Sequence, residues 1–367
     1  MQSDKHILVV GATGGVGQFI CREIIRVFQP SALVVCDYKV ERGQKFASEL
    51  GNEVNFRFVD VHDKASLHAA IKGVDAVIVS VQQQQPNVQS VCLEAKVPCF
   101  DVALRSDFVE KVHKLNAQAE AQGTPSLVMS GLFPGLSGII IKSIAERFSS
   151  VETIDSAFLQ NVNGTAGPAG AADMLGEFSL PVALATNTQP EQHKGFTLIK
   201  AVKFPEPFGE INMRLINYDE ADVIAQKLTV KAVNYWTAFN EESFNSLLNF
   251  CNRIKLLGLF RHPKWRMKLA RLVEKFKQSN PDAEEVSMVI EVSGIANDKK
   301  QRHTLSMNGP SDYGATAIAI TAMVKLFVDG KVTAKGVLYP LDVISFEALM
   351  PEMENSALEF FEMNEDL

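Results

Sequence analysis

The sequence lacks the features that mark several large classes of protein. No apolar run reaches the roughly 18 residues that a membrane span needs, and no charged-then-apolar segment of the kind seen in signal peptides precedes the first apolar run. Basic residues are not in excess, because 36 Lys and Arg stand against 43 Asp and Glu, for a net charge of −7. A nucleic-acid partner needs a basic face, so we expect a protein that does not bind nucleic acid. We also expect a cytoplasmic location.

Cysteine is scarce, and its spacing excludes the common metal motifs. The five cysteines form no CxxC pair and stand in apolar surroundings, which favours small buried thiols over disulfides or metal ligands. They are Cys21, Cys36, Cys92, Cys99 and Cys251. The histidines show no ligand spacing either, so we expect no metal site and a reducing compartment.

What the sequence does contain, in its first third, is a regular alternation of two patterns. Short apolar runs alternate with amphipathic helical stretches, which is typical of a parallel β-sheet covered by helices on both faces. The predicted strands span residues 5–10, 32–37, 54–60, 75–80, 98–103 and 125–130. With right-handed crossovers this pattern predicts an α/β protein with a doubly wound, Rossmann-type sheet.

The first predicted strand runs directly into a glycine-rich turn, "GATGGVG" at 11–17, and a helix follows at once. Glycines in this strand–turn–helix context allow a tight turn, close approach of backbone N–H groups to a pyrophosphate and close helix packing. No Gly-Lys-Ser/Thr follows, so a dinucleotide is favoured over ATP. The residues expected at the cofactor are Gly11, Ala12, Thr13, Gly14, Gly15, Val16 and Gly17.

An acid ends the second predicted strand. Asp37 lies twenty positions after Gly17, where a carboxylate can accept hydrogen bonds from the adenosine ribose and would repel a 2′-phosphate. This favours NAD over NADP. Lys39 and Arg42 lie close by in sequence, so NADP stays possible.

Residues that follow the third and fourth strands complete the predicted cofactor site. Asp60 and Val61 are expected beside the adenine, although Asp60 would equally serve as a helix N-cap. Ser80 and Val81 are expected along the path from pyrophosphate to nicotinamide, because ligands bind beyond the carboxyl ends of parallel strands.

The pattern changes near residue 151, which predicts a second domain. Alternating apolar residues predict strands at 152–159, 227–233, 287–295 and 302–307, with helices at 241–258 and 263–278. This describes an α+β domain with a largely antiparallel sheet. An apolar helix at 313–330 predicts a return to the first sheet. We therefore predict a dinucleotide-binding domain of 1–138 plus 310–350, an inserted domain of 139–309 and an acidic tail of 351–367.

Four stretches together resemble one family. "VVGATGGVG" (9–17), "VPCFDVA" (97–103), "SGLFPGLSGIIIKSIAERF" (130–148) and "YGATAIAITAMVKLFVDGKVTAKGVLYP" (313–340) are similar in order and spacing to the saccharopine dehydrogenase-like oxidoreductases. The resemblance implies a discontinuous Rossmann domain, an inserted domain bearing dimer contacts and a substrate cleft. It also implies NAD(P)-linked condensation of an amine with an aldehyde, or its oxidative reversal.

Two residues depart from the amino-acid-using members of that family. Phe100 stands where they tend to carry tyrosine, and Phe133 stands where they often carry aspartate. Because an ammonium group needs polar or anionic partners, these departures argue against saccharopine itself as the substrate. The family fold and cofactor are therefore expected, whereas the substrate is left open.

Few residues are candidates for catalysis, because the cofactor performs most of a hydride transfer. Asp101 and Arg105 follow the fifth strand and are expected near the nicotinamide, as substrate contacts or, alternatively, in a structural salt bridge or a helix cap. Asp101 is also expected at the cofactor. The substrate cleft is expected to be lined by Gln82 of the "QQQQP" run, by Phe133, Pro134, Gly135 and the helix N-cap Ser137, and by Arg214.

Residues 253–277 are rich in Lys and Arg with apolar residues between them. The pattern is typical of a helix with a solvated basic face, and it also fits peripheral contact with an anionic membrane. Two functions stay open: an NAD(P)-dependent oxidoreductase acting on a small imine, amine or carbonyl compound, and an NAD(P)-binding redox sensor or membrane-associated scaffold without turnover.

Overall fold

The computed structural model describes residues 5–164, 174–186, 189–261, 265, 268 and 284–367. It contains two compact units. The first comprises Met1–Ile139 and Tyr313–Ser356, and the second comprises Ile140–Asp312 and Ala357–Leu367. The chain therefore leaves the first unit, forms most of the second, returns to the first and ends in the second.

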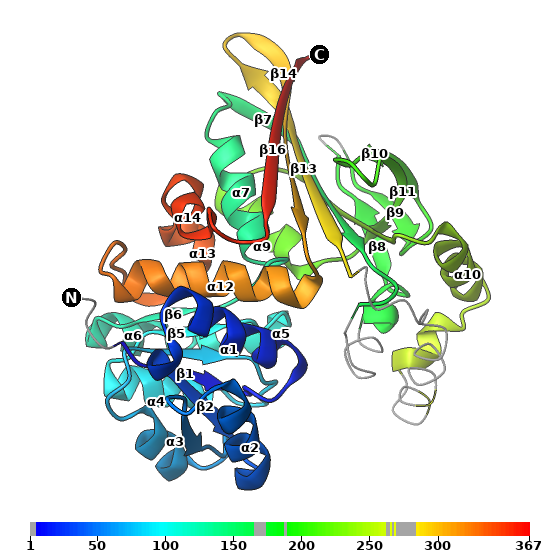
Figure 1. Ribbon diagram of the computed structural model, residues 1–367. Helices are drawn as coiled ribbons and strands as arrows, with labels where there is room; N and C mark the ends of the chain where they lie inside the picture. The colour runs from blue at the N-terminus through cyan, green and yellow to red at the C-terminus, as the bar shows by residue number, and fades with distance from the viewer. Residues whose placement is uncertain (1–4, 165–173, 187–188, 262–264, 266–267, 269–283) are drawn as a thin grey trace. The chain divides into compact units, whose positions relative to one another are not determined.

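The first unit is built on a seven-stranded sheet in which each neighbouring pair of strands is parallel. Its order is β15-β6-β5-β4-β1-β2-β3 (Figure 1). The strands are β1 (Ile7–Val10), β2 (Leu33–Asp37), β3 (Asn55–Phe58), β4 (Ala76–Val79), β5 (Cys99–Asp101), β6 (Pro125–Leu127) and β15 (Gly336–Leu338). The predicted doubly wound parallel sheet is confirmed.

Helices cover both faces of this sheet. The helices of the first unit are α1 (Gly15–Val27), α2 (Val40–Leu50), α3 (Lys64–Ile71), α4 (Asn87–Ala95), α5 (Ser106–His113), α6 (Asn116–Gln122), α12 (Asp312–Val328), α13 (Pro340–Val343) and α14 (Phe346–Met353). One apolar core joins β1, β2 and β4 to α3 and α4. Helix α12 packs on the sheet through Phe327, whose ring meets Phe100 of β5 edge-on at 5.2 Å.

The return of the chain explains why α12 is apolar on nearly every side. Ten of its residues are buried, among them Ala319, Ile320 and Met323. A helix buried this thoroughly has no polar face to show to solvent. After it, β15 pairs with β6 and extends the sheet by one strand.

The second unit has its own seven-stranded sheet, of order β10-β11-β12-β7-β13-β14-β16, and a two-stranded hairpin. The sheet strands are β7 (Ser150–Gln160), β10 (Ile199–Lys203), β11 (Glu210–Ile216), β12 (Ala232–Phe239), β13 (Val286–Ala296), β14 (Lys299–Gly309) and β16 (Glu359–Asp366), and the hairpin is β8 (Pro181–Leu184) with β9 (Glu191–Lys194). Only the β12–β7 pair is parallel within this sheet. The predicted, largely antiparallel second sheet is confirmed.

Two local predictions in this unit are wrong. The strand predicted at 227–233 is the end of helix α9 (Asp219–Leu228), closed by Thr229 in the left-handed conformation, and β12 begins only at Ala232. The acidic segment predicted as a tail forms β16, which pairs with β14 along eight residues. Its acidic side chains fall on an exposed edge strand, where charge is tolerated and limits pairing with other chains.

The helix predicted at 241–258 is shorter, ending as α10 (Glu242–Arg253). The predicted helix 263–278, most of the basic segment 253–277 and most of the glycine-rich stretch 163–173 lie outside the described residues. Among the described helices, none combines the length and the apolar character that crossing a bilayer requires. Four of the cysteines are buried thiols as predicted, whereas Cys251 is partly exposed.

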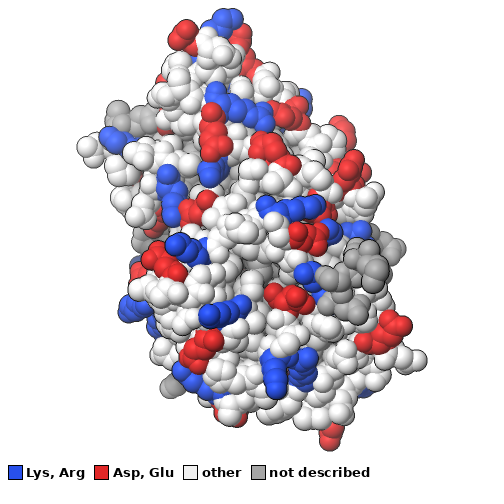
Figure 2. All heavy atoms as spheres, turned by 90° about the vertical axis from the view of Figure 1, so that its left-hand side faces the viewer, with Lys and Arg blue, Asp and Glu red and all other residues white. Residues whose placement is uncertain are grey.

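Acidic and basic side chains are interspersed on the face of the molecule shown in Figure 2. Several of them are paired within one unit, for example Arg26 with Glu23 at 2.6 Å and Lys142 with Glu146 at 3.8 Å. Exposed pairs of this kind each contribute little to stability.

Candidate dinucleotide-binding site

The glycine-rich turn between β1 and α1 is closed by its own backbone. The N–H of Gly14 donates to the carbonyl oxygen of Gly11 at 2.9 Å, and Gly11 has φ +88°. A methyl group on Gly17 would overlap that same carbonyl oxygen. The first turn of α1 therefore lies directly against the turn, and its N-terminus carries a partial positive charge that favours an anion.

The end of β4, followed by Ser80 and Val81, lies against this turn. A methyl group on Gly11 would lie 2.9 Å from Ser80 Oγ and 3.2 Å from Val81 Cβ. The Ser80 hydroxyl donates to the Val10 carbonyl at 3.0 Å. Side chains and backbone of two neighbouring strand ends thus meet at the glycines.

Asp37 is connected to the turn by a hydrogen bond that sequence analysis did not predict. The Thr13 hydroxyl donates to its carboxylate, and the Lys39 N–H donates to it at 2.7 Å. Arg42 makes a bidentate contact, from Nε at 2.9 Å and from Nη2 at 2.8 Å. Burial raises the pKa of Asp37, but the hydrogen bonds from Arg42, Thr13 and Lys39 outweigh it and hold the pKa below its usual value.

The other predicted adenosine-side residues follow β3. The carboxylate of Asp60 accepts from the His62 N–H at 2.9 Å, which shapes the turn before α3. The N-cap of α3 is instead Asp63. The Val61 carbonyl accepts from the Asn87 side chain at 2.9 Å, so the loop after β3 is joined to the start of α4.

Asp101 ends β5 and is almost fully buried, with 1 % of its surface exposed. Its carboxylate accepts from the Gln89 side-chain amide and from the Ala103 N–H at 2.7 Å. Burial, opposed by these two hydrogen bonds, raises the pKa of Asp101 to about 7. Arg105 is exposed, stands at the N-cap position of α5 and bonds bidentately to Asp107, at 2.9 and 2.8 Å, which fits the structural alternative for this residue.

The loop after β6, which carries Phe133, Pro134 and Gly135, folds tightly on itself. The Gly131 N–H donates to the Pro134 carbonyl at 3.0 Å, and the peptide bond before Pro134 is cis. Gly135 has φ +126°, and a methyl group there would lie 2.6 Å from the Met129 carbonyl oxygen. Only glycine fits at this position.

Ser137 does not cap the following helix. Helix α7 begins one residue earlier, as Leu136–Ala145, and Ser137 lies buried in its first turn. Pro134 and Gly135 end the loop before the serine is reached, and this moves the helix start. The prediction of Ser137 as the N-cap is therefore wrong. Gln82 is exposed in the loop after β4.

Arg214 belongs to the core of the second unit rather than to an open surface. It is 1 % exposed on β11, and its guanidinium lies 2.6 Å from Glu242 Oε1 and 5.4 Å from the centre of the Phe196 ring. A guanidinium held in this way is occupied by its own chain. His193 of the same unit lies 3.6 Å from Glu191, and both residues are on β9.

Tyr313 is a residue of this site that sequence analysis missed. A methyl group on Gly15 would lie 2.8 Å from its Cε2 atom, and its ring meets Phe19 of α1 edge-on at 6.1 Å. The start of the returning helix α12 therefore lies against the glycine turn. In the sequence, Tyr313 could have been noticed as an aromatic residue in the first turn of a helix that otherwise consists largely of small and apolar residues.

These residues fit a dinucleotide. A glycine cradle without side chains, a helix N-terminus and a carboxylate at the end of β2 occupy the positions at which pyrophosphate and adenosine ribose bind in doubly wound sheets. Gly11, Gly14 and Gly15 would hold the pyrophosphate and Asp37 the ribose. Within the described part of the chain, no cluster of His, Cys, Asp or Glu has the make-up of a metal site.

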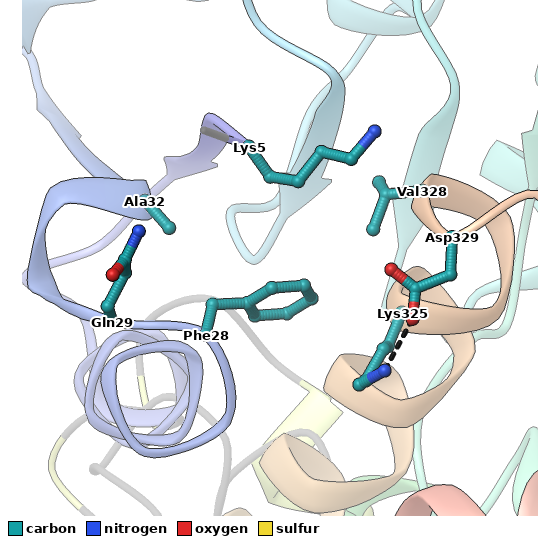
Figure 3. A pocket seen from close by; sticks show the side chains of 7 residues that line it. All are labelled: Lys5, Phe28, Gln29, Ala32, Lys325, Val328 and Asp329. Carbon is teal, nitrogen blue, oxygen red and sulfur yellow. Dashed lines mark hydrogen bonds and ion pairs between the residues drawn. The ribbon is translucent and has the colours of Figure 1, made fainter. Parts of the chain in front are cut away.

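A cavity of about 290 Å³ lies elsewhere in the first unit (Figure 3). It is lined by Lys5, Phe28, Gln29, Ala32, Lys325, Val328 and Asp329. Lys5 precedes β1 and Ala32 precedes β2, which places the cavity at the amino ends of the strands. Since dinucleotides bind beyond the carboxyl ends, this cavity is separate from the site.

Residues 7–127 match the family model described as the saccharopine dehydrogenase NADP binding domain. Over these residues the chain is similar to the cofactor-binding domain of saccharopine dehydrogenases. The family resemblance predicted from four sequence stretches is confirmed. The match ends at the close of β6, so it covers the glycine turn, Asp37 and Asp101.

Solved structures show the fold of this chain over nearly its whole length. Saccharopine dehydrogenase (L-Glu forming) of Saccharomyces cerevisiae superposes with a TM-score of 0.70 at 13% identity, covering 98% of this chain and 100% of that one. DAP dehydrogenase of C. glutamicum gives 0.50 at 12% identity, covering 95% and 97%. The predicted class of NAD(P)-dependent dehydrogenases is confirmed at the level of domain family and fold.

Two curated relatives match the chain over part of its length. Eugenol synthase 1 of Petunia hybrida is 30% identical over 129 residues, which is 34% of this chain and 42% of that protein. Phenylcoumaran benzylic ether reductase of Pinus taeda is 28% identical over 169 residues, 40% of this chain and 54% of that protein. The chain thus spans about half the length of the curated relatives it matches.

Proposed function

We propose that the chain is an NAD(P)-dependent oxidoreductase that transfers hydride between its dinucleotide and a small imine, amine or carbonyl substrate. The observation that carries this proposal is the glycine turn, closed by Gly11 and tied through Thr13 to the buried carboxylate of Asp37. The bound dinucleotide would supply the hydride chemistry. The chain's own residues bind and orient it.

The test is turnover. Stereospecific oxidation of NADH or NADPH is expected with at least one member of a panel of oxo-acids and aldehydes, each offered with and without an amine. Binding of the dinucleotide without turnover across the whole panel would instead support the sensor or scaffold function.

We further propose that NAD is the preferred dinucleotide. Asp37 offers carboxylate oxygens at the ribose position, and a 2′-phosphate brought there would meet a negative charge. Arg42 partly offsets this repulsion because its guanidinium is bound to that carboxylate. The description of the matching family names NADP, and Arg42 is the cation that a 2′-phosphate would use. The pair Asp37–Arg42 is therefore the point at which the two cofactors are distinguished.

Replacing Asp37 with serine should reverse the preference. The variant loses the carboxylate that repels a 2′-phosphate and releases Arg42, so the ratio of the NADPH and NADH dissociation constants is expected to fall by tenfold or more, about 1.4 kcal/mol. Isothermal titration with each reduced dinucleotide measures both constants.

Arg42→Met is the matched control. It keeps the carboxylate and removes the cation, so NADPH binding should weaken more than NADH binding. A wild-type protein that binds NADPH more tightly than NADH would contradict the proposed preference.

A further inference from the structure

Asp101 is a buried acid whose carboxylate is hydrogen-bonded to uncharged groups. Its two carboxylate oxygens accept from the amide of Gln89 and the N–H of Ala103, and no lysine or arginine of the described chain forms an ion pair with it. An ionised carboxylate in such surroundings lacks the cation that normally compensates burial.

Its partner Gln89 is itself held in one orientation. The side-chain oxygen of Gln89, Oε1, accepts a hydrogen bond from the side-chain NH₂ group of Gln83 at 3.2 Å. The NH₂ group of Gln89 is therefore directed to Asp101. The side chain of Gln83 is held in turn, because its Oε1 atom accepts a hydrogen bond from the Val88 N–H at 3.2 Å. One residue of the four-glutamine run thus orients the amide that contacts the acid.

The position of Asp101 relates it to the cofactor site. It pairs with Val79 of β4 in the parallel register, and Val79 directly precedes Ser80, which lies against Gly11. The residue therefore ends the strand next to β4, on the side away from Asp37 and the adenosine half of the proposed site. In a doubly wound sheet this is the side of the nicotinamide half.

We infer that Asp101 makes this chain bind the oxidised, positively charged nicotinamide more tightly than the reduced, neutral one. The inference rests on the proposed function and adds a preference for one redox state of the cofactor. Asp101 acts here as a positioning residue through charge, with Gln89 and Gln83 holding its carboxylate in place.

The groups that face this carboxylate leave its charge uncompensated. From α4 it meets the amide of Gln89, and after β6 the Ser130 N–H donates to its main-chain carbonyl at 2.9 Å. The thiol of Cys99 is the titratable neighbour on β5, and its own pKa is raised well above the usual value by its hydrogen bond to Cys92 and by burial, so it stays neutral.

The pH dependence follows from these groups. The pKa of Asp101 is about 7, so its carboxyl group is partly protonated near neutral pH. Binding of the positively charged nicotinamide favours the ionised form, and the carboxyl group therefore releases a proton when NAD⁺ binds. Affinity for NAD⁺ should rise by up to about tenfold in total between pH 5.5 and 8.5, most steeply between pH 6 and pH 7, and level off near pH 8, whereas affinity for NADH should change little.

The test compares dissociation constants of NAD⁺ and NADH between pH 5.5 and 8.5 by isothermal titration, in two buffers of different ionisation enthalpy so that proton release is counted. In Asp101→Asn, NAD⁺ binding is expected to weaken about tenfold relative to NADH, and its pH dependence to disappear. Because the ionised carboxyl of Asp101 destabilises the fold as the pH rises through about 7, this neutral variant should fold.

Two further variants make the test specific. Gln89→Met removes a hydrogen bond that lowers the pKa of Asp101, so the midpoint of the NAD⁺ profile should move to higher pH. Asp75→Asn neutralises a carboxylate at the amino end of β4, where it accepts from the His6 N–H at 2.8 Å, and should leave the ratio of the two constants unchanged.

The outcomes separate the two proposals. If the wild-type protein bound neither dinucleotide, the proposed function would fail. If it bound both, and Asp101→Asn kept the wild-type ratio and pH profile, only the inference about Asp101 would be overturned.

Discussion

Gly17→Ala is expected to abolish dinucleotide binding and to lower the free energy of unfolding by about 3 kcal/mol. The added methyl group would overlap the Gly11 carbonyl oxygen, which is main-chain and already accepts from the Gly14 N–H. Either α1 must move away from the turn or the turn must open. Both displace the N–H groups that would contact the pyrophosphate. Urea unfolding and titration with NADH measure the two effects.

Gly14→Ala is the matched control in the same turn. Its methyl group would lie 3.1 Å from the Gly11 carbonyl oxygen, and Gly14 has φ −74°, which any residue adopts. The stability of this variant should stay within about 1 kcal/mol of the wild-type value. Equal loss of stability in the two variants would show that the close approach of α1 is not what requires glycine at position 17.

Removing the partner of a buried guanidinium is expected to give the second large effect. Glu242→Ala should lower the free energy of unfolding by about 3 kcal/mol, the lower end of the range for a broken buried pair, because the Glu242 side chain is itself half exposed. Arg214 would keep only the Asn212 carbonyl at 2.9 Å and the face of Phe196.

The effect should depend on pH in a defined direction. Burial raises the pKa of Glu242, but its hydrogen bond and charge interaction with Arg214 outweigh this and hold the pKa below its usual value. The stabilisation is therefore present above the unfolded-state pKa, about 4.3, and is lost as the pH falls through the lower folded-state pKa. Urea unfolding of wild type and variant from pH 7 down to pH 3 should show the difference shrinking.

Arg214→Lys distinguishes a core arginine from a substrate-binding one. Lysine cannot reproduce the bidentate geometry of a guanidinium, so a core role predicts lower stability. A variant of wild-type stability with a raised KM would instead support the substrate role predicted from sequence.

Much of the first unit could be predicted because its strands are buried on both faces. "ILVV" and "AVIV" are continuous apolar runs that are fully buried in β1 and β4, and the glycine turn follows the first of them directly. Strands such as β9, "EQHK", and β10, "IKAVK", are largely exposed. Their sequences show no regular spacing of apolar residues that would distinguish a strand from a loop.

The pairing of side chains was less predictable than their presence. Asp37 and Arg42 were both identified, but their mutual hydrogen bonds depend on where α2 begins after β2. Gln89 and Asp101 are twelve positions apart, and they meet only because α4 packs beside β5. The signal for Gln89 was a polar residue on the apolar face of a predicted helix, between Val88 and Val91.

The order in which the chain is synthesised gives β15 a further significance. This strand, residues 336–338, pairs with β6, residues 125–127, and about two hundred residues of the chain come between them. Until these intervening residues and β15 have been synthesised, β6 is an open edge of the sheet that can pair with other chains. The first sheet is therefore finished only after the ribosome has passed residues 140–312 of the second unit, and we expect residues 1–139 alone to aggregate rather than to fold.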